Sequence, residues 1–263
     1  MLIVFSDSKI KTGYVSYSDS RFNYPYKGFC SIVCGIIDMC LEHYIENDNF
    51  NLIIDDSQIS FLFDNISSKS DEIYDAGKTW LEKFFSNQTY QQEYNAHTPA
   101  SLENLKIKNK VYNNVLKIKE EYLKKFEDKK KKLCIDSNTL GVQIRGTDKS
   151  TEIAELKLEN IFYSIDMVDR EKIFVATDDK FYLDALIDRY GNRIIYDDSV
   201  TISHDKKSIH HNCFDRNKIN EEVLSSVYLL SNCKYFLYSF SNVSLLALIM
   251  GVHNFNYIDY LNK

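Results

Sequence analysis

TLGVQIRGTDKSTE, residues 139–152, is the stretch of this 263-residue chain that decides its fold. Its first part is mostly apolar and its second part is polar, which is typical of a buried strand that ends in a loop. Similar apolar segments follow at KIFVAT (172–177), NRIIYD (192–197), YFLYSF (235–240) and FNYID (255–259). Apolar residues at helical spacing predict helices between them, over residues 158–168, 180–190, 217–231 and 243–250. This alternation predicts a parallel sheet with right-handed crossovers and helices on both faces, so residues 134–263 are expected to form a Rossmann-like domain.

The N-terminal half carries a weaker pattern of the same class. Apolar residues at helical spacing predict one helix over residues 27–45, and FNLIIDDS, residues 50–57, has the composition of a buried parallel strand. Residues 105–126 predict a single long amphipathic helix. We therefore expect an α/β fold with two Rossmann-like halves. The first half is shortened and spans residues 1–133, and the boundary is expected between residues 127 and 138.

Two segments of the N-terminal half are less regular. Residues 57–100 contain many aromatic side chains without periodicity, which predicts short helices and loops. Those aromatics would either belong to the core or stack on a bound ligand. The lysine-rich segment EDKKKKL, residues 127–133, is interpreted as a helix end that faces water, with a phosphate-binding or membrane-binding patch as the alternative.

Composition excludes several classes of protein. The chain has 32 basic and 38 acidic side chains, a formal net charge of −6, which argues against a nucleic-acid-binding protein. A hydrophobic content of 44% is too high for a disordered chain. With only 8 glycines and 2 prolines, long flexible linkers are not expected. These values favour a compact globular protein whose oligomeric state the sequence leaves open.

The sequence carries no pattern typical of export or of a membrane span. The first residues, MLIVFSDSKIKTGYVSYSDS, lack a basic region and a long apolar region, so no secretory signal is expected. No apolar run approaches the roughly 20 residues that span a bilayer. The six cysteines form no CxxC pair, and reduced, buried thiols are favoured over disulfides or metal ligands. A cytoplasmic location is the expectation.

Polar residues follow three of the predicted strands of the C-terminal half. They are Arg145-Gly146-Thr147-Asp148-Lys149 after the first strand, Thr177-Asp178-Asp179 after the next, and Ser239-Phe240-Ser241-Asn242-Val243-Ser244 after YFLY. In an open parallel sheet, ligands bind at the carboxyl ends of the strands, so these residues are expected to converge on one crevice.

The chemistry of these residues suits a nucleoside diphosphate. The fork of Arg145 can bind phosphate oxygens bidentately, and Ser241 and Asn242 precede a helix whose N-terminus would attract an anion. Asp178 and Asp179 would accept hydrogen bonds from a base or a ribose. Each set also has a purely structural alternative: an ion pair between Arg145 and Asp148, and helix capping by the aspartates, by Ser241 or by Asn242.

Other chemistries lack their motifs. The chain contains neither G-x-G-x-x-G, nor a Walker A motif, nor G-x-S-x-G, which excludes the usual dinucleotide, P-loop and hydrolase signatures. His210, His211 and Cys213 have no second pair at zinc-ligand spacing, and no D-x-D follows a strand. No metal site is therefore expected.

GVQIRGTDKSTE resembles the first motif of the GDP-fucose fucosyltransferase superfamily, particularly its α-1,6 and rhizobial nodulation enzymes. That motif runs roughly G-V-H-x-R-[RG]-T-D-K and is followed shortly by Glu. VATDD resembles the second motif and LLSNCKYFLYSFSNVSLLA the third, so the motifs cover residues 141–250. The resemblance implies a GT-B fold in which the N-terminal half holds the acceptor. It departs from the family at Gln143, where a histidine is usual, and in the short length of the chain.

The resemblance also implies roles for individual residues. Arg145 would hold the β-phosphate of the donor, Glu152 would be the general base, and Lys149 would complete the catalytic set. A surface glutamate near a helix N-terminus is the alternative for Glu152. The implied donor-binding residues are Arg145, Gly146, Thr147, Asp148, Thr177, Asp178, Asp179, His210, Ser239, Ser241, Asn242 and Ser244.

The function that follows is metal-independent, inverting transfer of L-fucose from GDP-fucose to a glycan hydroxyl, with no cofactor. Two alternatives remain open at this point. One is a catalytically inactive module that binds a nucleotide sugar or a glycan. The other is a transferase that uses another GDP-hexose. The acceptor and the linkage are not set by the sequence.

Overall fold

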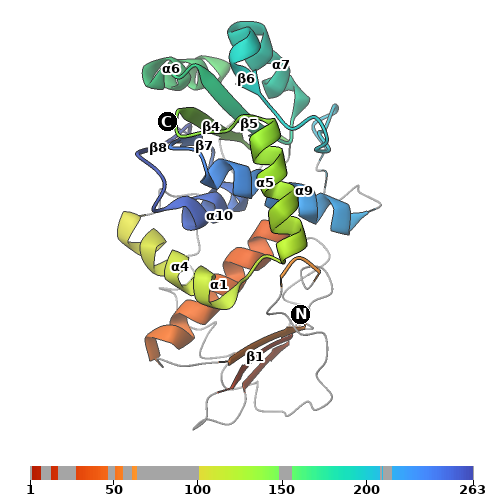
Figure 1. The fold of residues 1–263 in the computed structure, drawn as a ribbon, viewed down its shortest axis with the longest axis vertical. Helices are drawn as coiled ribbons and strands as arrows, with labels where there is room; N and C mark the ends of the chain where they lie inside the picture. The colour runs from red at the N-terminus through yellow and green to blue at the C-terminus, as the bar shows by residue number, and fades with distance from the viewer. Residues whose placement is uncertain are drawn as a thin grey trace. The chain divides into compact units, whose positions relative to one another are not determined.

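The computed structural model describes residues 2–6, 13–16, 28–46, 51–55, 61–63, 101–147, 156–207, 209 and 215–262. Close contacts divide the chain into two compact units. Unit 1 comprises Met1–Asn95 and Ile107–Tyr122, and unit 2 comprises Ala96–Lys106 and Leu123–Lys263. The units are described separately below (Figure 1).

Unit 2 contains a five-stranded sheet in which every neighbouring pair of strands is parallel, with the order β6-β5-β4-β7-β8. The strands predicted from residue 139 onward are confirmed, and so are the helices between them. In chain order the elements are β4 (Thr139–Ile144), α6 (Leu158–Val168), β5 (Lys172–Thr177), α7 (Lys180–Tyr190), a 3-10 turn η3 (Gly191–Arg193), β6 (Ile194–Ile195), α9 (Arg216–Ser231), β7 (Tyr235–Tyr238), α10 (Asn242–Gly251) and β8 (Tyr257–Tyr260).

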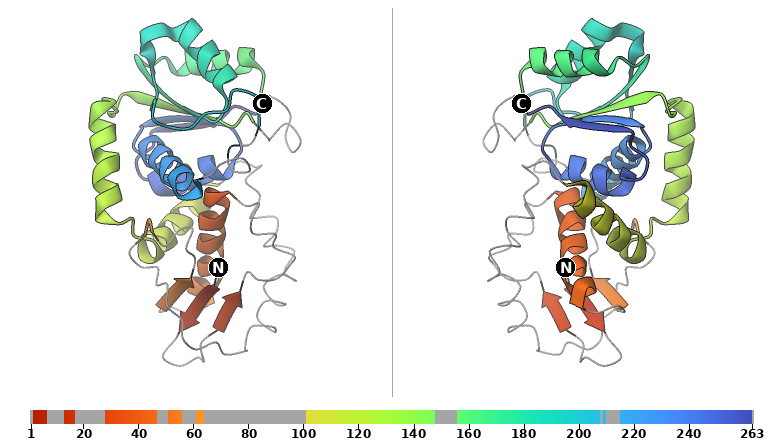
Figure 2. Two further views of the ribbon diagram at one scale, coloured as in Figure 1. Left: turned by 90° about the vertical axis from the view of Figure 1, so that its right-hand side faces the viewer. Right: turned by 90° about the vertical axis from the view of Figure 1, so that its left-hand side faces the viewer.

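Helices cover both faces of this sheet. α6 and α7 lie on one face, and α9 and α10 lie on the other (Figures 1 and 2). Strand alternation explains the two layers: Leu140, Val142 and Ile144 enter the apolar core shared with α6 and α7, whereas Gly141 and Gln143 face the opposite way. A Cβ atom on Gly141 would lie 3.2 Å from Cys233 Sγ and from Leu230 Cδ2, so this small residue lets the end of α9 approach β4 closely.

The strand order reverses direction at β4. From β4 the chain first builds outward through β5 and β6, and then returns to the other side of β4 with β7 and β8. The junction between β4 and β7 is therefore the topological switch point of the sheet. Ligands of doubly wound α/β sheets bind at such a point, beyond the carboxyl ends of the strands.

Unit 1 differs from the expected parallel layer. Its strands β1 (Leu2–Ser6), β2 (Gly13–Ser16) and β3 (Asn51–Asp55) form an antiparallel sheet with the order β2-β1-β3. The parallel direction predicted for the FNLIIDDS strand is thus wrong. Its apolar composition indicates a strand, but its direction depends on β1, a partner remote in sequence that the N-terminal residues supply. The predicted helix of this half is confirmed as α1 (Phe29–Glu46).

The single long helix predicted over residues 105–126 is also wrong. It is two helices, α4 (Leu102–Val115) and α5 (Glu120–Lys132). The break lies where Ile118 pairs in an antiparallel bridge with Phe63, and where the Lys119 amide donates to the Leu62 carbonyl at 2.9 Å. Apolar spacing continues through the break because Ile118 is buried, so periodicity alone does not reveal it.

α5 packs within unit 2, although the sequence assigned it to the N-terminal half. Phe126 is buried and its ring lies 5.8 Å from that of Tyr228 on α9. Lys129 Nζ contacts Asp197 Oδ2 at 2.6 Å, and Lys130 Nζ donates to Asn232 Oδ1 at 2.8 Å. The lysine-rich helix end is therefore only partly a water-facing segment, because two of its lysines join α5 to the rest of the unit.

The contact between Lys129 and Asp197 predicts a pH-dependent contribution to stability. Burial raises the pKa of the Asp197 carboxyl, but hydrogen bonds from Lys129 and Ser199 outweigh it, so the pKa lies below its usual value. A depressed carboxyl pKa stabilises the fold above the usual value, about 4, and this stabilisation is lost as the pH falls through the folded-state pKa. Lys129→Met is expected to lower the free energy of unfolding by roughly 1 kcal/mol at pH 7 and by less at pH 3, which is below the usual carboxyl pKa.

Urea unfolding at the two pH values measures this effect. Lys131→Met is the matched control, because Lys131 is exposed and the partner that the described residues give it is Asp128 on the same helix. An equal loss for Lys129→Met at both pH values would contradict the assignment.

Candidate functional site

The three predicted polar segments meet at the carboxyl ends of β4, β5 and β7. The backbone amide of Arg145, just beyond β4, donates to Ser239 Oγ, just beyond β7, at 2.8 Å. The amide of Gly146 donates to Asp178 Oδ1, just beyond β5, at 2.8 Å. Neighbouring parallel strands end at the same edge of the sheet, which explains why residues so far apart in sequence come together.

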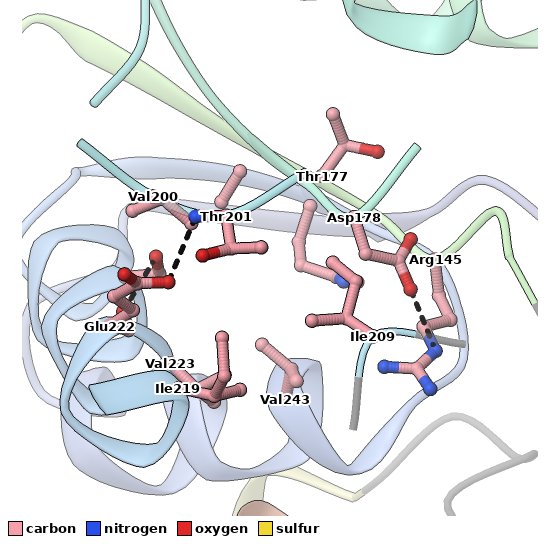
Figure 3. A pocket seen from close by; sticks show the side chains of 13 residues that line it. Arg145, Thr177, Asp178, Val200, Thr201, Ile209, Ile219, Glu222, Val223 and Val243 are labelled. Atoms are coloured by element: carbon pink, nitrogen blue, oxygen red, sulfur yellow. Dashed lines mark hydrogen bonds and ion pairs between the residues drawn. The ribbon is translucent and has the colours of Figure 1, made fainter. Parts of the chain in front are cut away.

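Asp178 holds the loop that carries Arg145. Besides the Gly146 amide, its carboxylate accepts the Thr147 hydroxyl at 2.7 Å and lies 3.1 Å from Arg145 Nε. The ion pair involves Nε, and the two terminal nitrogens of the guanidinium lie on the side away from Asp178 (Figure 3). Asp178 was expected to bind a base or a ribose. Its contacts make it the residue that positions Arg145. Asp178 also lines the cavity described below, so its contact with a base or a ribose stays a prediction.

Asp179 adopts the capping alternative. It is the N-cap of α7, its Oδ1 accepts the Phe181 amide at 2.9 Å, and the residue is buried. Gly146 packs directly against it: a Cβ atom there would lie 2.6 Å from Asp179 Cβ, so only glycine fits without a shift of the loop. Thr177 completes the turn by accepting the Asp179 amide at 3.2 Å.

The serines after β7 form a buried network around Gln143. Gln143 Oε1 accepts hydroxyl groups from Ser239 at 3.0 Å, Ser241 at 3.2 Å and Ser244 at 2.5 Å. Ser241 is also the N-cap of α10, where it accepts the Ser244 amide at 3.1 Å. All three serines are buried, so their hydroxyls connect β4 to α10 and do not line the cavity described next. The resemblance implied that all three serines bind the donor, and that role stays a prediction.

An apolar cavity of about 90 Å³ lies beside this network. Arg145 and Asp178 form one end of it, and Val243, in the first turn of α10, forms part of its wall (Figure 3). The arginine and the N-terminal turn of α10 therefore border the same cavity. The remaining lining residues are Gln143, Ala176, Thr177, Val200, Thr201, Ile209, Ile219, Glu222, Val223 and Ser226.

Sequence reasoning missed the opposite end of the cavity. Glu222, on α9, is only 7% exposed and lies beside Thr201, whose backbone amide donates to Glu222 Oε2 at 2.8 Å (Figure 3). One signal was available: Glu222 occupies the buried face of a predicted helix, three residues after Ile219, and a carboxylate on such a face is unusual even with Lys218 one turn before it. The segment around Thr201 has no regular structure and offers no comparable signal.

Four predicted site residues lie outside the described part of the chain: Asp148, Lys149, Glu152 and His210. The suggested ion pair between Arg145 and Asp148 falls there too. The ion pair that the structure describes for Arg145 is with Asp178.

The described ranges contain neither a candidate metal-binding cluster nor a candidate membrane-spanning helix. No cluster of three or more His, Cys, Asp or Glu side chains in them could hold a metal ion. None of the helices in those ranges is long and apolar enough to cross a bilayer. Among the described cysteines, none of which forms a disulfide, Cys30, Cys34 and Cys233 are buried as expected, whereas Cys134 is exposed.

No protein-family model matches the sequence, and no curated protein matches it. The fold is similar to three solved fucosyltransferase structures. NodZ α-1,6-fucosyltransferase soaked with GDP-fucose has 15% identity and a TM-score of 0.39 over 57% of this chain and 47% of that one. Arabidopsis thaliana FUT1 in complex with GDP has 13% identity and a TM-score of 0.40 over 57% and 36%. POFUT1 in complex with GDP-fucose has 10% identity and a TM-score of 0.37 over 63% and 52%. This chain thus matches about half of each of these structures or less.

Proposed function

We propose that the chain is a glycosyltransferase of the GT-B type that moves L-fucose from GDP-fucose to a glycan hydroxyl, with inversion and without a metal. One observation carries the proposal: Arg145 and the first turn of α10 border a single cavity at the switch point of the sheet. A cationic fork and a helix N-terminus are two devices that proteins use to bind phosphate. Their common cavity suits the diphosphate of a nucleotide sugar.

In the proposed reaction the acceptor hydroxyl attacks C1 of the sugar while the bond from C1 to the β-phosphate oxygen breaks. Negative charge grows on the β-phosphate, and Arg145 would stabilise it more in the transition state than in the bound donor. Asp178 contributes by holding Arg145 through Nε, so less reorganisation is needed when that charge develops.

The remaining roles are proposed for residues whose positions are not described. Glu152 would take the proton of the acceptor hydroxyl, a contribution of roughly 10²- to 10⁴-fold in such reactions. Lys149 and Asp148 would complete the donor loop, and His210 would lie at its rim. Residues 1–133 would supply the acceptor side.

A thermal-shift panel of GDP, UDP, ADP and their sugars tests the proposal. A ligand at a hundred times its Kd stabilises a protein by about 2.7 kcal/mol, which raises Tm by roughly 5 to 10 °C for a unit of this size. GDP and GDP-fucose are expected to produce this shift, and UDP and ADP are not. The absence of a shift with every guanine nucleotide would contradict the proposal.

A second measurement separates the alternatives. Release of GDP from GDP-fucose, with mixed oligosaccharides and a chelator present, is expected from an active, metal-independent transferase. Binding without release would indicate an inactive nucleotide-sugar-binding module, and faster release from another GDP-hexose would change the donor sugar.

A further inference from the structure

One wall of the cavity beside Arg145 comes from residues 196–202, a segment without regular structure that we call the strap. The strap leaves the sheet directly after β6. Parallel pairing with β5 ends at Ile195 and resumes in a single bridge at Ser203, and between these points the seven residues of the strap lie beside four residues of the β5 segment. Because the two stretches differ in length, the pairing of the sheet does not fix the position of the strap.

Cavities lie on both sides of the strap. Val200 and Thr201 line the cavity of about 90 Å³ described above (Figure 3). Val200 also lines a second cavity of about 270 Å³ toward α7, together with the strap residues Asp197, Asp198 and Ile202. Unfilled space supplies none of the contacts by which close packing holds a side chain in place. The position of the strap therefore depends on its polar contacts.

Backbone hydrogen bonds hold the C-terminal part of the strap. The Thr201 amide donates to Glu222 Oε2 on α9 at 2.8 Å. Just beyond the strap, the Ser203 amide donates to the Asp178 carbonyl at 2.9 Å. Both bonds act on residues 201–203, so they leave the preceding turn to be positioned by other groups.

That preceding turn is organised by Asp197 and held by Lys129 of α5. The Asp197 carbonyl accepts the Val200 amide at 3.2 Å, and its Oδ1 accepts the Ser199 amide at 3.0 Å and the Ser199 hydroxyl at 2.6 Å. Lys129 Nζ lies 2.6 Å from Asp197 Oδ2 and donates to Ser199 Oγ at 3.1 Å. The Asp197 side chain is only 9% exposed, so water and salt screen its pair with Lys129 weakly. Lys129 thus contacts both side chains that shape the turn before Val200.

We propose that Lys129 is a positioning residue of the cavity, which holds the strap against the bound nucleotide through Asp197 and Ser199. The inference rests on the proposed function, because it takes the occupant of the cavity to be a nucleotide. Lys129 is not among the residues that line the cavity, so it acts through the strap. Without Lys129 the turn can move toward the second cavity. The fraction of molecules with a complete cavity wall then falls, and the apparent affinity falls in proportion.

Titration calorimetry at pH 7 with GDP and with guanosine tests this assignment. Lys129→Met is expected to weaken the binding of both ligands roughly fivefold, because the competent fraction affects every ligand of the cavity alike. Thr201 of the strap and Arg145 lie at opposite ends of the cavity (Figure 3). The loss should therefore be the same with and without phosphates, unlike a loss that originates at Arg145.

Lys130→Met is the matched control on the same helix. Lys130 Nζ donates to Asn232 Oδ1 at 2.8 Å and lies 3.9 Å from Glu127 Oε1, so its described contacts join α5 to α9 and do not include the strap. Both variants are expected to lower the stability of the protein, but Lys130→Met should keep the GDP affinity of the unmodified protein. Equal weakening of GDP binding in the two variants would show that Lys129 merely docks α5, and would overturn the inference.

A second variant tests the route through the strap. Asp197→Asn keeps an acceptor for Ser199 but removes the charge that holds Lys129, so it should weaken GDP binding to a similar extent. The double variant should be no weaker than the weaker single variant, because both changes break one contact. Additive losses would contradict that route.

Unchanged GDP affinity in Lys129→Met would also overturn the inference, and GDP binding itself would leave the proposed function standing. If the unmodified protein binds neither GDP nor guanosine, the proposed function fails and the inference fails with it.

Discussion

Arg145→Ala is expected to reduce GDP-fucose turnover by at least 100-fold, the usual consequence of removing a group that stabilises developing charge. Its guanidinium borders the cavity and is oriented by Asp178, so alanine removes both the charge and the fork that matches a phosphate. Stability should change by less than about 1 kcal/mol, because Asp178 keeps its bonds to the Gly146 amide and the Thr147 hydroxyl.

Binding measurements test whether the loss of the Arg145 side chain acts through the phosphates of the nucleotide. Arg145→Ala should weaken binding of GDP but leave binding of guanosine, which has no phosphate, nearly unchanged. Arg189→Ala is the matched control: its guanidinium pairs with Asp166 between α7 and α6 and does not line the cavity. Full turnover in Arg145→Ala would remove this arginine from the mechanism.

Arg145→Lys provides a finer comparison within the same site. Lysine keeps a positive charge but lacks the planar fork, and its single nitrogen cannot contact Asp178 and a phosphate as Arg145 would. An activity near that of Arg145→Ala would show that geometry matters as much as charge.

Much of unit 2 could be predicted from the sequence because its order is local. Each strand is a short apolar run, each helix shows a 3.6-residue period, and their alternation indicates a parallel sheet. The errors occur where a remote partner decides the outcome. The direction of β3 depends on β1, and the break between α4 and α5 depends on the pairing of Ile118 with Phe63.

The candidate site shows the same division. Arg145, Asp178 and Ser239 each follow a predicted strand, and the sequence correctly predicted that they lie close together. That proximity follows from the topology of a parallel sheet. The position of these residues in the sequence does not reveal which polar groups face a ligand and which face each other. Asp178 and the serines satisfy protein groups, whereas the carboxylate of Glu222, a residue read only as part of a helix, is left with unused acceptor capacity.

Gln143→Met is expected to lower the free energy of unfolding by about 3 kcal/mol, because it removes the acceptor shared by three buried hydroxyls. Methionine fits the length and flexibility of glutamine, so the loss comes from hydrogen bonding more than from packing. Ser244 can turn to the Ser239 carbonyl, which lies 2.6 Å away, but no other acceptor is described for the Ser239 hydroxyl. Since Ser239 also accepts the Arg145 amide, GDP binding should weaken as well.

Ser244→Ala is the control that isolates the acceptor. It removes one hydroxyl but leaves Gln143 with donors from Ser239 and Ser241, so about 1 kcal/mol is expected. The asymmetry follows from a general rule: a buried polar group that loses its only partner costs more than the deletion of one partner among several. Urea unfolding of both variants measures it. If Gln143→Met were no more destabilising than Ser244→Ala, the network would not be what joins β4 to α10 at the switch point, and the positioning of Arg145 would need another cause.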